Sequence, residues 1–457
     1  MIKEFLIIIN FIFFATISCS YSNGSGNKSA LSGQATTNER KSLPVLVIRS
    51  FMNPLDNISK DSLIAGLNEG RITCTADIAN TLYRELSLKK EPAIQYINAF
   101  PLRDSSALML TTIDSMEPRW LTVRVDSLSF FKSPDAYALY TAPSKERFDF
   151  SGSVTRYTHT GVTAITRQTG VILDRIGISS YIKNILPYFQ TSELTHVSNE
   201  VSASDSCNYS MMKLKFATKT SHFETLKMLH VNIVELTGNH NIDFGAAAYK
   251  NTFQWYAKNG MRYFGAGLSP GEANKPLIMT LKDGKKIAWI GFNELCPLGE
   301  CADIAFGANR YDEQKAGNTI DSIHKNKLAD YIIACVQFGE IDSYSPTGSQ
   351  KKISRKLIDL GADVVIGSQA HQAQEIAIYH NKLIFYGLGN FLFDQIHRTG
   401  VRQAFFLECY FYKGKIIQFQ PVYTFMSADR IPTIADPVQR SAIEKAILKD
   451  QNFPLEN

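Results

Sequence analysis

Strands and helices alternate along the chain from about residue 150, and this alternation constrains the fold more than any other feature. Apolar runs rich in valine and isoleucine are separated by segments with helical periodicity. Because helices that alternate with strands bury both faces of a sheet, the pattern predicts a layered α/β domain. The predicted strands are residues 162–166, 194–198, 233–237, 287–292, 331–337 and 364–368, and the clearest helices are residues 174–189, 246–259 and 350–360.

Polar side chains follow four of these strands directly. The carboxyl ends of parallel strands meet at one edge of a sheet, so we expect these side chains to converge on one crevice. Buried strands that end in amide, imidazole and carboxylate groups are typical of a site. The candidates are Asn199, Glu200, Asn239, His240, Gln337, Glu340, Gln369 and His371, and a further strand-like run over residues 383–395 adds Asn390.

Two motifs carry a resemblance to a known family. Residues 238–245 read Gly-Asn-His-Asn-Ile-Asp-Phe-Gly, and residues 387–395 read Gly-Leu-Gly-Asn-Phe-Leu-Phe-Asp-Gln. With these motifs, residues 154–425 resemble the CapA/PgsA family of bacterial poly-γ-glutamate capsule proteins. The resemblance implies a layered sheet-and-helix domain related to calcineurin-like metallophosphoesterases, here preceded by a smaller α/β domain.

The chain departs from the family's pattern at several positions. Val162 stands where the family has an aspartate, and Gln337 replaces the histidine of its His-Trp-Gly motif. Ser368 and Gln369 replace the first two histidines of Gly-His-His-Pro-His, of which His371 stays. Serine and glutamine are poorer transition-metal ligands than imidazole, and valine cannot ligate a metal. We therefore do not expect the two-metal centre of a phosphoesterase.

The retained residues leave a metal interpretation open. By the resemblance, Glu200, Asn239 and His371, with Gln369 in support, could hold one divalent cation through mainly oxygen donors. The identity of that cation is not predicted.

The alternative is a metal-free polar crevice. Its substrate-binding residues would be Asn199, Gln337, Gln369 and Asn390. Such a crevice suits a polymer rich in amides and carboxylates. It could also perform acid/base catalysis, and the residues that would do so are His240, Glu200 and Glu340.

The start of the chain predicts export. Lys3 precedes an apolar run over residues 5–16, which is too short to span a bilayer and is typical of a signal peptide at residues 1–18. Cys19 after a small residue resembles a lipoprotein cleavage box, so we expect its lipidation and a flexible tether over residues 19–42. The chain would then be a periplasm-facing envelope lipoprotein that contacts the membrane through its lipid anchor only.

Three folded segments are expected after the tether. Residues 43–148 predict a small α/β domain that weakly resembles half of a periplasmic solute-binding protein, with strands at residues 43–48, 107–113 and 120–125 and a helix at 76–88. Residues 149–430 form the CapA-like domain. Residues 431–457 form a helical tail, with a helix at about 436–449.

Charge and cysteine patterns add limits. The formal net charge is +5, and the charges are interspersed, so no nucleic-acid partner is expected. Cys296 and Cys301 are close enough in sequence for a local disulfide. Cys335 lies in an apolar run and predicts a buried thiol. His159 and His196 belong to no motif, so core or surface roles are expected for them.

Three functions therefore remain open. The first, implied by the resemblance, is synthesis or handling of an anionic envelope polymer such as poly-γ-glutamate or its precursor, together with membrane-bound synthesis or export proteins. The second is an envelope hydrolase, either a one-metal phosphoesterase or an amide-cleaving enzyme. The third is a non-catalytic polymer- or ligand-binding protein.

Overall fold

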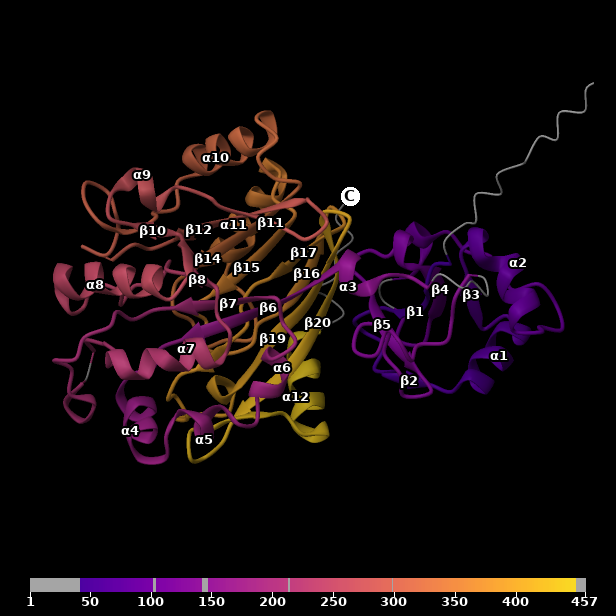
Figure 1. Ribbon diagram of the computed structural model, residues 1–457, viewed down its shortest axis with the longest axis horizontal. Coiled ribbons are helices and arrows are strands. Elements are labelled where there is room, and N and C mark those ends of the chain that lie inside the picture. The colour runs from indigo at the N-terminus through magenta and orange to yellow at the C-terminus, as the bar shows by residue number, and fades with distance from the viewer. Residues whose placement is uncertain (1–41, 102–103, 142–146, 213, 298, 449–457) are drawn as a thin grey trace, which may run out of the picture. The chain divides into compact units, whose positions relative to one another are not determined.

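The structure is a computed structural model that describes residues 42–101, 104–141, 147–212, 214–297 and 299–448 (Figure 1). These residues belong to one compact unit. The predicted signal peptide, Cys19 and the tether up to residue 41 lie outside the described residues. Within the described ranges, no helix is long and apolar enough to cross a bilayer.

The first part of the described chain forms a sheet of its own. It has five strands in the order β2-β5-β1-β4-β3. This mixture of strands and helices confirms the α/β character predicted there, whereas the division into domains stays a prediction. The elements are β1 (Val45–Arg49), β2 (Asn57–Ile58), α1 (Lys60–Glu69), β3 (Ile72–Cys74), α2 (Ala76–Glu85), β4 (Leu108–Thr112) and β5 (Leu121–Val125).

An eight-stranded sheet follows, in the order β21-β20-β19-β6-β7-β8-β9, with β18 paired to β6. Strands β6, β7, β8 and β9 run parallel to one another. The strands are β6 (Val154–Thr163), β7 (Leu194–Asn199), β8 (Ile233–Glu235), β9 (Arg262–Phe264), β18 (Asn390–Leu392), β19 (Gln403–Tyr412), β20 (Lys415–Met426) and β21 (Pro432–Ile434).

A six-stranded sheet completes the fold, in the order β11-β12-β14-β15-β17-β16, with β12, β14, β15 and β17 parallel. A two-stranded sheet pairs β10 (Ala266–Gly267) with β13 (Gly307–Ala308). The six strands are β11 (Leu277–Thr280), β12 (Lys286–Asn293), β14 (Tyr331–Gln337), β15 (Val364–Ser368), β16 (Ile376–Tyr379) and β17 (Lys382–Phe385).

The two large sheets share one apolar core, and helices cover their outer faces. On β14, Ile333 and Cys335 face the core shared with the other sheet, whereas Ala334 and Val336 pack with helix residues, as the two-residue period of a strand requires. The covering helices are α4 (Arg167–Ile176), α5 (Ile178–Ile182), α6 (Leu186–Phe189), α7 (Glu224–Met228), α8 (Gly245–Lys258), α10 (Glu313–Lys325) and α11 (Gly348–Leu360). Three further helices are α3 (Phe150–Ser153), α9 (Pro270–Ala273) and α12 (Pro437–Ile447), of which α3 and α12 bury residues in the shared core. The predicted layered α/β architecture is confirmed.

Two predicted elements were wrong in their bounds. The strand expected at residues 162–166 is β6, which begins at Val154, because polar residues such as His159 are buried in the shared core rather than ending the strand. The helix expected at residues 174–189 is broken into α4, α5 and α6. Gly177 adopts φ +76° after α4, a conformation that favours glycine and ends a helix.

Candidate functional site

The carboxyl ends of four strands bring the predicted residues together. Glu200 follows β7, Asn239 and His240 follow β8, Gln337 ends β14, and Gln369 with His371 follows β15. An isolated parallel bridge pairs Val201 with His240. Gly238 permits this approach, because a side chain there would meet the Cα atom of Glu200 at 2.7 Å. We name Glu200, Asn239, His240, Gln337, Gln369 and His371 the strand-end cluster.

A network of amides holds the centre of the cluster. Asn239 Oδ1 accepts hydrogen bonds from Gln337 Nε2 at 2.8 Å and from Gln369 Nε2 at 3.2 Å. Gln337 Oε1 lies 3.5 Å from Asn293 Nδ2, which links the network to the end of β12. With its oxygen engaged on this side, the Asn239 amide directs its Nδ2 group the other way as a hydrogen-bond donor.

Glu200 is a buried acid whose carboxyl group lacks a hydrogen-bond partner at one oxygen within the described part of the chain. The residue is 1% exposed, and its Oε1 atom has no hydrogen-bond partner among the described residues. Burial raises the pKa of the Glu200 carboxyl to about 8, and the nearby Glu235 and Glu340 carboxylates add to the rise. Glu200 is therefore mostly protonated at neutral pH, and its carboxyl group can donate as well as accept a hydrogen bond.

His240 and Arg167 form a part-exposed side of the site. Asp243 Oδ2 bonds His240 Nδ1 at 2.8 Å and also accepts from the Phe216 backbone N–H at 2.7 Å. The Arg167 guanidinium lies 4.7 Å from the centre of the Phe216 ring, and that ring lies 4.2 Å from the His240 ring. Arg167 is also paired with Asp394.

A hydrogen bond to Asn390 positions the His371 ring. Its Nδ1 atom lies 2.9 Å from Asn390 Oδ1, and its Nε2 atom lies 3.7 Å from the carboxylate of Glu340, whose side chain is 64% exposed. Burial lowers the pKa of His371, and Asn390 and Glu340 offset part of the effect. Gln369 and His371 both adopt positive φ, at +75° and +54°, which is uncommon outside glycine and typical of functional loops.

The side-chain amides of two predicted substrate-binding residues form hydrogen bonds within the protein. Asn199 Nδ2 donates to Val201 O at 2.7 Å and to the Tyr256 hydroxyl at 2.8 Å, so this amide faces α8. Asn390 Nδ2 donates to Gln395 Oε1 and to the Val401 carbonyl, both at 3.2 Å. In this structure both amide nitrogens hold neighbouring segments of the chain in place and are not free to bind a substrate.

Comparison with known proteins decides the family. The family model described as "Bacterial capsule synthesis protein PGA_cap" matches residues 149–395, which is more than half of the chain. The chain belongs to this family. The predicted resemblance to CapA/PgsA proteins is thereby confirmed, and the matched span contains every residue of the strand-end cluster.

Two relatives and one solved structure illustrate the similarity. The chain is 25% identical to "PGA biosynthesis protein CapA" of Bacillus subtilis over 309 residues, covering 66% of this chain and 80% of the relative. It is 24% identical to "Capsule biosynthesis protein CapA" of Bacillus anthracis, covering 52% of this chain and 59% of that protein. A putative 5'-nucleotidase from Staphylococcus aureus matches with a TM-score of 0.36 and 11% identity over 64% of this chain and 58% of that one, which carries no argument about the site.

The family's metal interpretation can be tested against the donor atoms. Asn239 Oδ1, the atom that would bind a cation, already accepts two hydrogen bonds from the glutamines that stand in place of histidines. The unpartnered Oε1 atoms of Glu200 and Gln369, with His371 Nε2, could hold one divalent cation. These residues do not fit a two-metal clamp, which needs more anionic and imidazole ligands.

Arg167 lies beside the site but was not among the residues predicted from the sequence. Arg167 follows β6 at its carboxyl end, so the rule that found Glu200 after β7 applies to it equally. The expected disulfide between Cys296 and Cys301 is confirmed and lies beside Asn293, whose Oδ1 accepts from the Cys296 backbone N–H at 2.6 Å.

Proposed function

We propose that this PGA_cap family member is a lipid-anchored, periplasm-facing accessory protein of poly-γ-glutamate synthesis or export. In this proposal, the strand-end cluster holds the polymer or its precursor. Family membership and the names of the two Bacillus relatives support this choice of polymer. The observation that carries the proposal is the amide network, in which Gln337 and Gln369 orient Asn239 where the resemblance leads one to expect metal-binding histidines.

The chemistry of the cluster suits such a polymer. Poly-γ-glutamate repeats an amide and a carboxylate in each unit, so its binding site needs hydrogen-bond donors and no buried negative charge. Asn239 offers its Nδ2 group, and Glu200, with its pKa raised to about 8, is a neutral donor at pH 7. The nearby Arg167 guanidinium, which is paired with Asp394, adds further N–H donors. Deprotonated acids in these places would repel the polymer instead.

The location of the protein is part of the proposal. Lipidation at Cys19 would tether the folded part to the membrane surface, where the enzymes that make or export the polymer lie. The partners are then membrane-bound synthesis or export proteins, with contact to the membrane through the lipid only.

An amide-cleaving hydrolase is the second candidate, and one observation favours it. His240 bonds Asp243 through Nδ1, which leaves Nε2 to act as a general base toward water. Protonated Glu200, just after the neighbouring strand β7, could act as the general acid toward the leaving amine. Polymer binding and polymer cleavage would then use the same residues.

A binding assay separates these candidates. Fluorescently labelled poly-γ-glutamate is titrated with the full chain in detergent and EDTA, with poly-α-glutamate as a competitor of the same charge. The proposal expects saturable binding in which the γ-linked polymer competes at least about tenfold better. Absence of saturable binding contradicts the proposal. Shortening of the polymer on longer incubation, lost in Glu200→Gln, would identify the hydrolase.

A further inference from the structure

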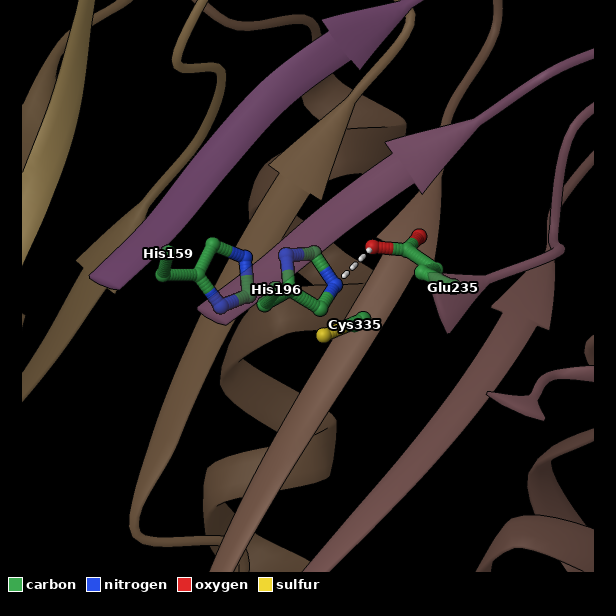
Figure 2. A group of neighbouring side chains, drawn as sticks. All are labelled: His159, His196, Glu235 and Cys335. Atoms are coloured by element: carbon green, nitrogen blue, oxygen red, sulfur yellow. Dashed lines mark ion pairs between the residues drawn. The ribbon is translucent and has the colours of Figure 1, made fainter. Parts of the chain in front are cut away.

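A second polar group lies in the core between the two large sheets. His159 on β6, His196 on β7 and Glu235 on β8 project from three neighbouring strands of the eight-stranded sheet, and Cys335 projects toward them from β14 of the other sheet (Figure 2). His159 and His196 are register partners. We name these four residues the inter-sheet cluster. Both histidines lie in the core, one of the two places expected for them, and there they share a cluster that their sequence positions did not reveal.

The cluster brings four metal-ligating atoms together. One nitrogen from each histidine, the Cys335 sulfur and a Glu235 oxygen all lie within 4.8 Å of one another. A tetrahedral zinc site places neighbouring ligand atoms about 3.3 to 3.7 Å apart. The His159 and His196 rings are stacked, with centroids 3.7 Å apart and planes 13° apart, so closing this set around one ion needs one imidazole to turn about its Cβ–Cγ bond. No other group of this kind is found among the described residues.

One residue of the cluster, His196, is poorly satisfied without a ligand. The others have partners, since His159 bonds Tyr157 and Glu235 accepts from the Thr237 hydroxyl and bonds the Cys335 thiol. The four residues are at most 2% exposed, and their surroundings include Trp289, Ile333 and Phe264 of the apolar core. His196 Nε2 lies 3.2 Å from Glu235 Oε2, yet neither ring nitrogen of His196 makes a well-directed hydrogen bond to a described residue. A fully buried imidazole with both nitrogens unsatisfied costs free energy of folding, and a bound ion would remove that cost.

We propose that the inter-sheet cluster binds one zinc-like transition-metal ion that ties the two sheets together. Two imidazoles, a thiolate and a carboxylate are a ligand set typical of zinc. The thiolate and the carboxylate together balance the two positive charges of the ion, so the filled site carries no net charge in a core that disfavours charge. Binding releases the thiol proton and any proton on Glu235 to solvent.

The surroundings of His159 fit a ligand role. Tyr157 Oη lies 2.6 Å from His159 Nδ1 and accepts a hydrogen bond from Trp289 Nε1 at 3.0 Å. With the proton on Nδ1 directed to the tyrosine oxygen, His159 Nε2 is left as the metal-binding nitrogen. Metal-binding histidines usually donate their second nitrogen to such a partner, which fixes the ring.

The role of this ion is structural, because the site is closed to solvent. Such an ion is acquired as the chain folds. Only a few residues beyond the cluster, Glu200 follows β7, Asn239 follows β8 and Gln337 ends β14. The ion would therefore brace the scaffold of the strand-end cluster without contacting substrate.

Metal analysis of the full chain, purified in detergent after growth with added zinc, tests the proposal. We expect about one zinc per chain in the wild type and a loss of at least tenfold in Cys335→Ser. Cys409→Ser is the matched control, because Cys409 is also a buried free thiol on a strand but lies outside the cluster. Glu200→Gln should keep the ion, which separates this site from the strand-end cluster.

If Cys335→Ser does not fold, the metal ligands of the wild-type protein test the proposal instead. X-ray absorption at the zinc edge should show one sulfur ligand at about 2.3 Å with nitrogen and oxygen ligands, and growth with Co²⁺ should give a thiolate-to-metal charge-transfer band. A wild type without bound metal, or bound metal without a sulfur ligand, overturns the proposal. The outcome of the poly-γ-glutamate assay neither supports nor overturns this proposal, which is decided by the metal content and the ligands of the metal.

Discussion

Gln337 Nε2 donates a hydrogen bond of 2.8 Å to the side-chain oxygen of Asn239. By its resemblance to the family, Gln337 stands where a histidine is expected, and in this chain its amide donates to a neighbouring amide. The same relationship is repeated by Gln369. It is the basis for the proposed polymer-binding function.

The buried acid Glu200 gives a pH dependence of stability. Its pKa is about 8 in the folded chain, against an ordinary value of 4.5, so the folded state keeps a proton that the unfolded state releases. Its stabilising contribution is present below about pH 4.5 and is lost as the pH rises to about 8. In metal-free protein, Glu200→Gln should therefore flatten the fall in unfolding free energy over this range by a few kcal/mol at most.

Urea denaturation at several pH values measures this effect. Glu69→Gln is the matched control, because that side chain is 55% exposed on α1 and lies outside the strand-end cluster, so it should leave the profile unchanged. Equal pH profiles for wild type and Glu200→Gln would show that Glu200 is ionised in the folded chain.

Substitution of Asn390 should lower the stability of the fold, because its side chain forms hydrogen bonds within the protein. Its side chain contacts His371, Gln395 and the Val401 carbonyl, so Asn390→Ala would leave buried polar groups unpaired. We expect a loss of about 2 to 3 kcal/mol in unfolding free energy, measured by urea denaturation. Asn326→Ala, at an exposed helix end, should change stability by less than about 0.5 kcal/mol. A fully stable Asn390→Ala that only loses polymer affinity would instead assign Asn390 to the polymer.

Arg167 should give polymer binding its dependence on salt. The guanidinium lies beside the Phe216 and Phe393 rings, within the part-exposed side of the site. Arg167→Met keeps much of the packing but removes the charge, so polymer affinity should fall several-fold at low salt and vary less with salt concentration. Arg398→Met is the control variant for salt dependence, because Arg398 is also a part-exposed arginine paired with an aspartate, Asp342. An unchanged salt dependence in Arg167→Met would remove Arg167 from the binding site.

Two halves of the strand-end cluster could be predicted from sequence, because β7 and β8 are parallel neighbours in one sheet and β14 and β15 are parallel neighbours in the other. The packing of the two sheets then brings the two halves together. The side-chain direction is harder to predict, because it depends on where each strand ends. Asn199 is the last residue of β7 and faces α8, whereas Glu200 is the next residue and faces the cluster.

The inter-sheet cluster could not be predicted in this way. His159, His196 and Glu235 share one sheet, but Cys335 comes from the other, and only the packing of the two sheets brings the thiol to the imidazoles. No local spacing of cysteine and histidine marks such a site, because its ligands are spread over 159–335. The break after α4, by contrast, had a visible signal in Gly177.

The most direct test of the central claim is poly-γ-glutamate binding by wild type and Asn239→Ala, titrated in EDTA by fluorescence anisotropy. Asn239→Ala removes the amide that Gln337 and Gln369 orient, and Asn326→Ala serves as the control. We predict saturable binding without metal, an affinity loss of about tenfold in Asn239→Ala and none in Asn326→Ala. Binding that needs a divalent cation, or equal affinity in all three proteins, would contradict the account.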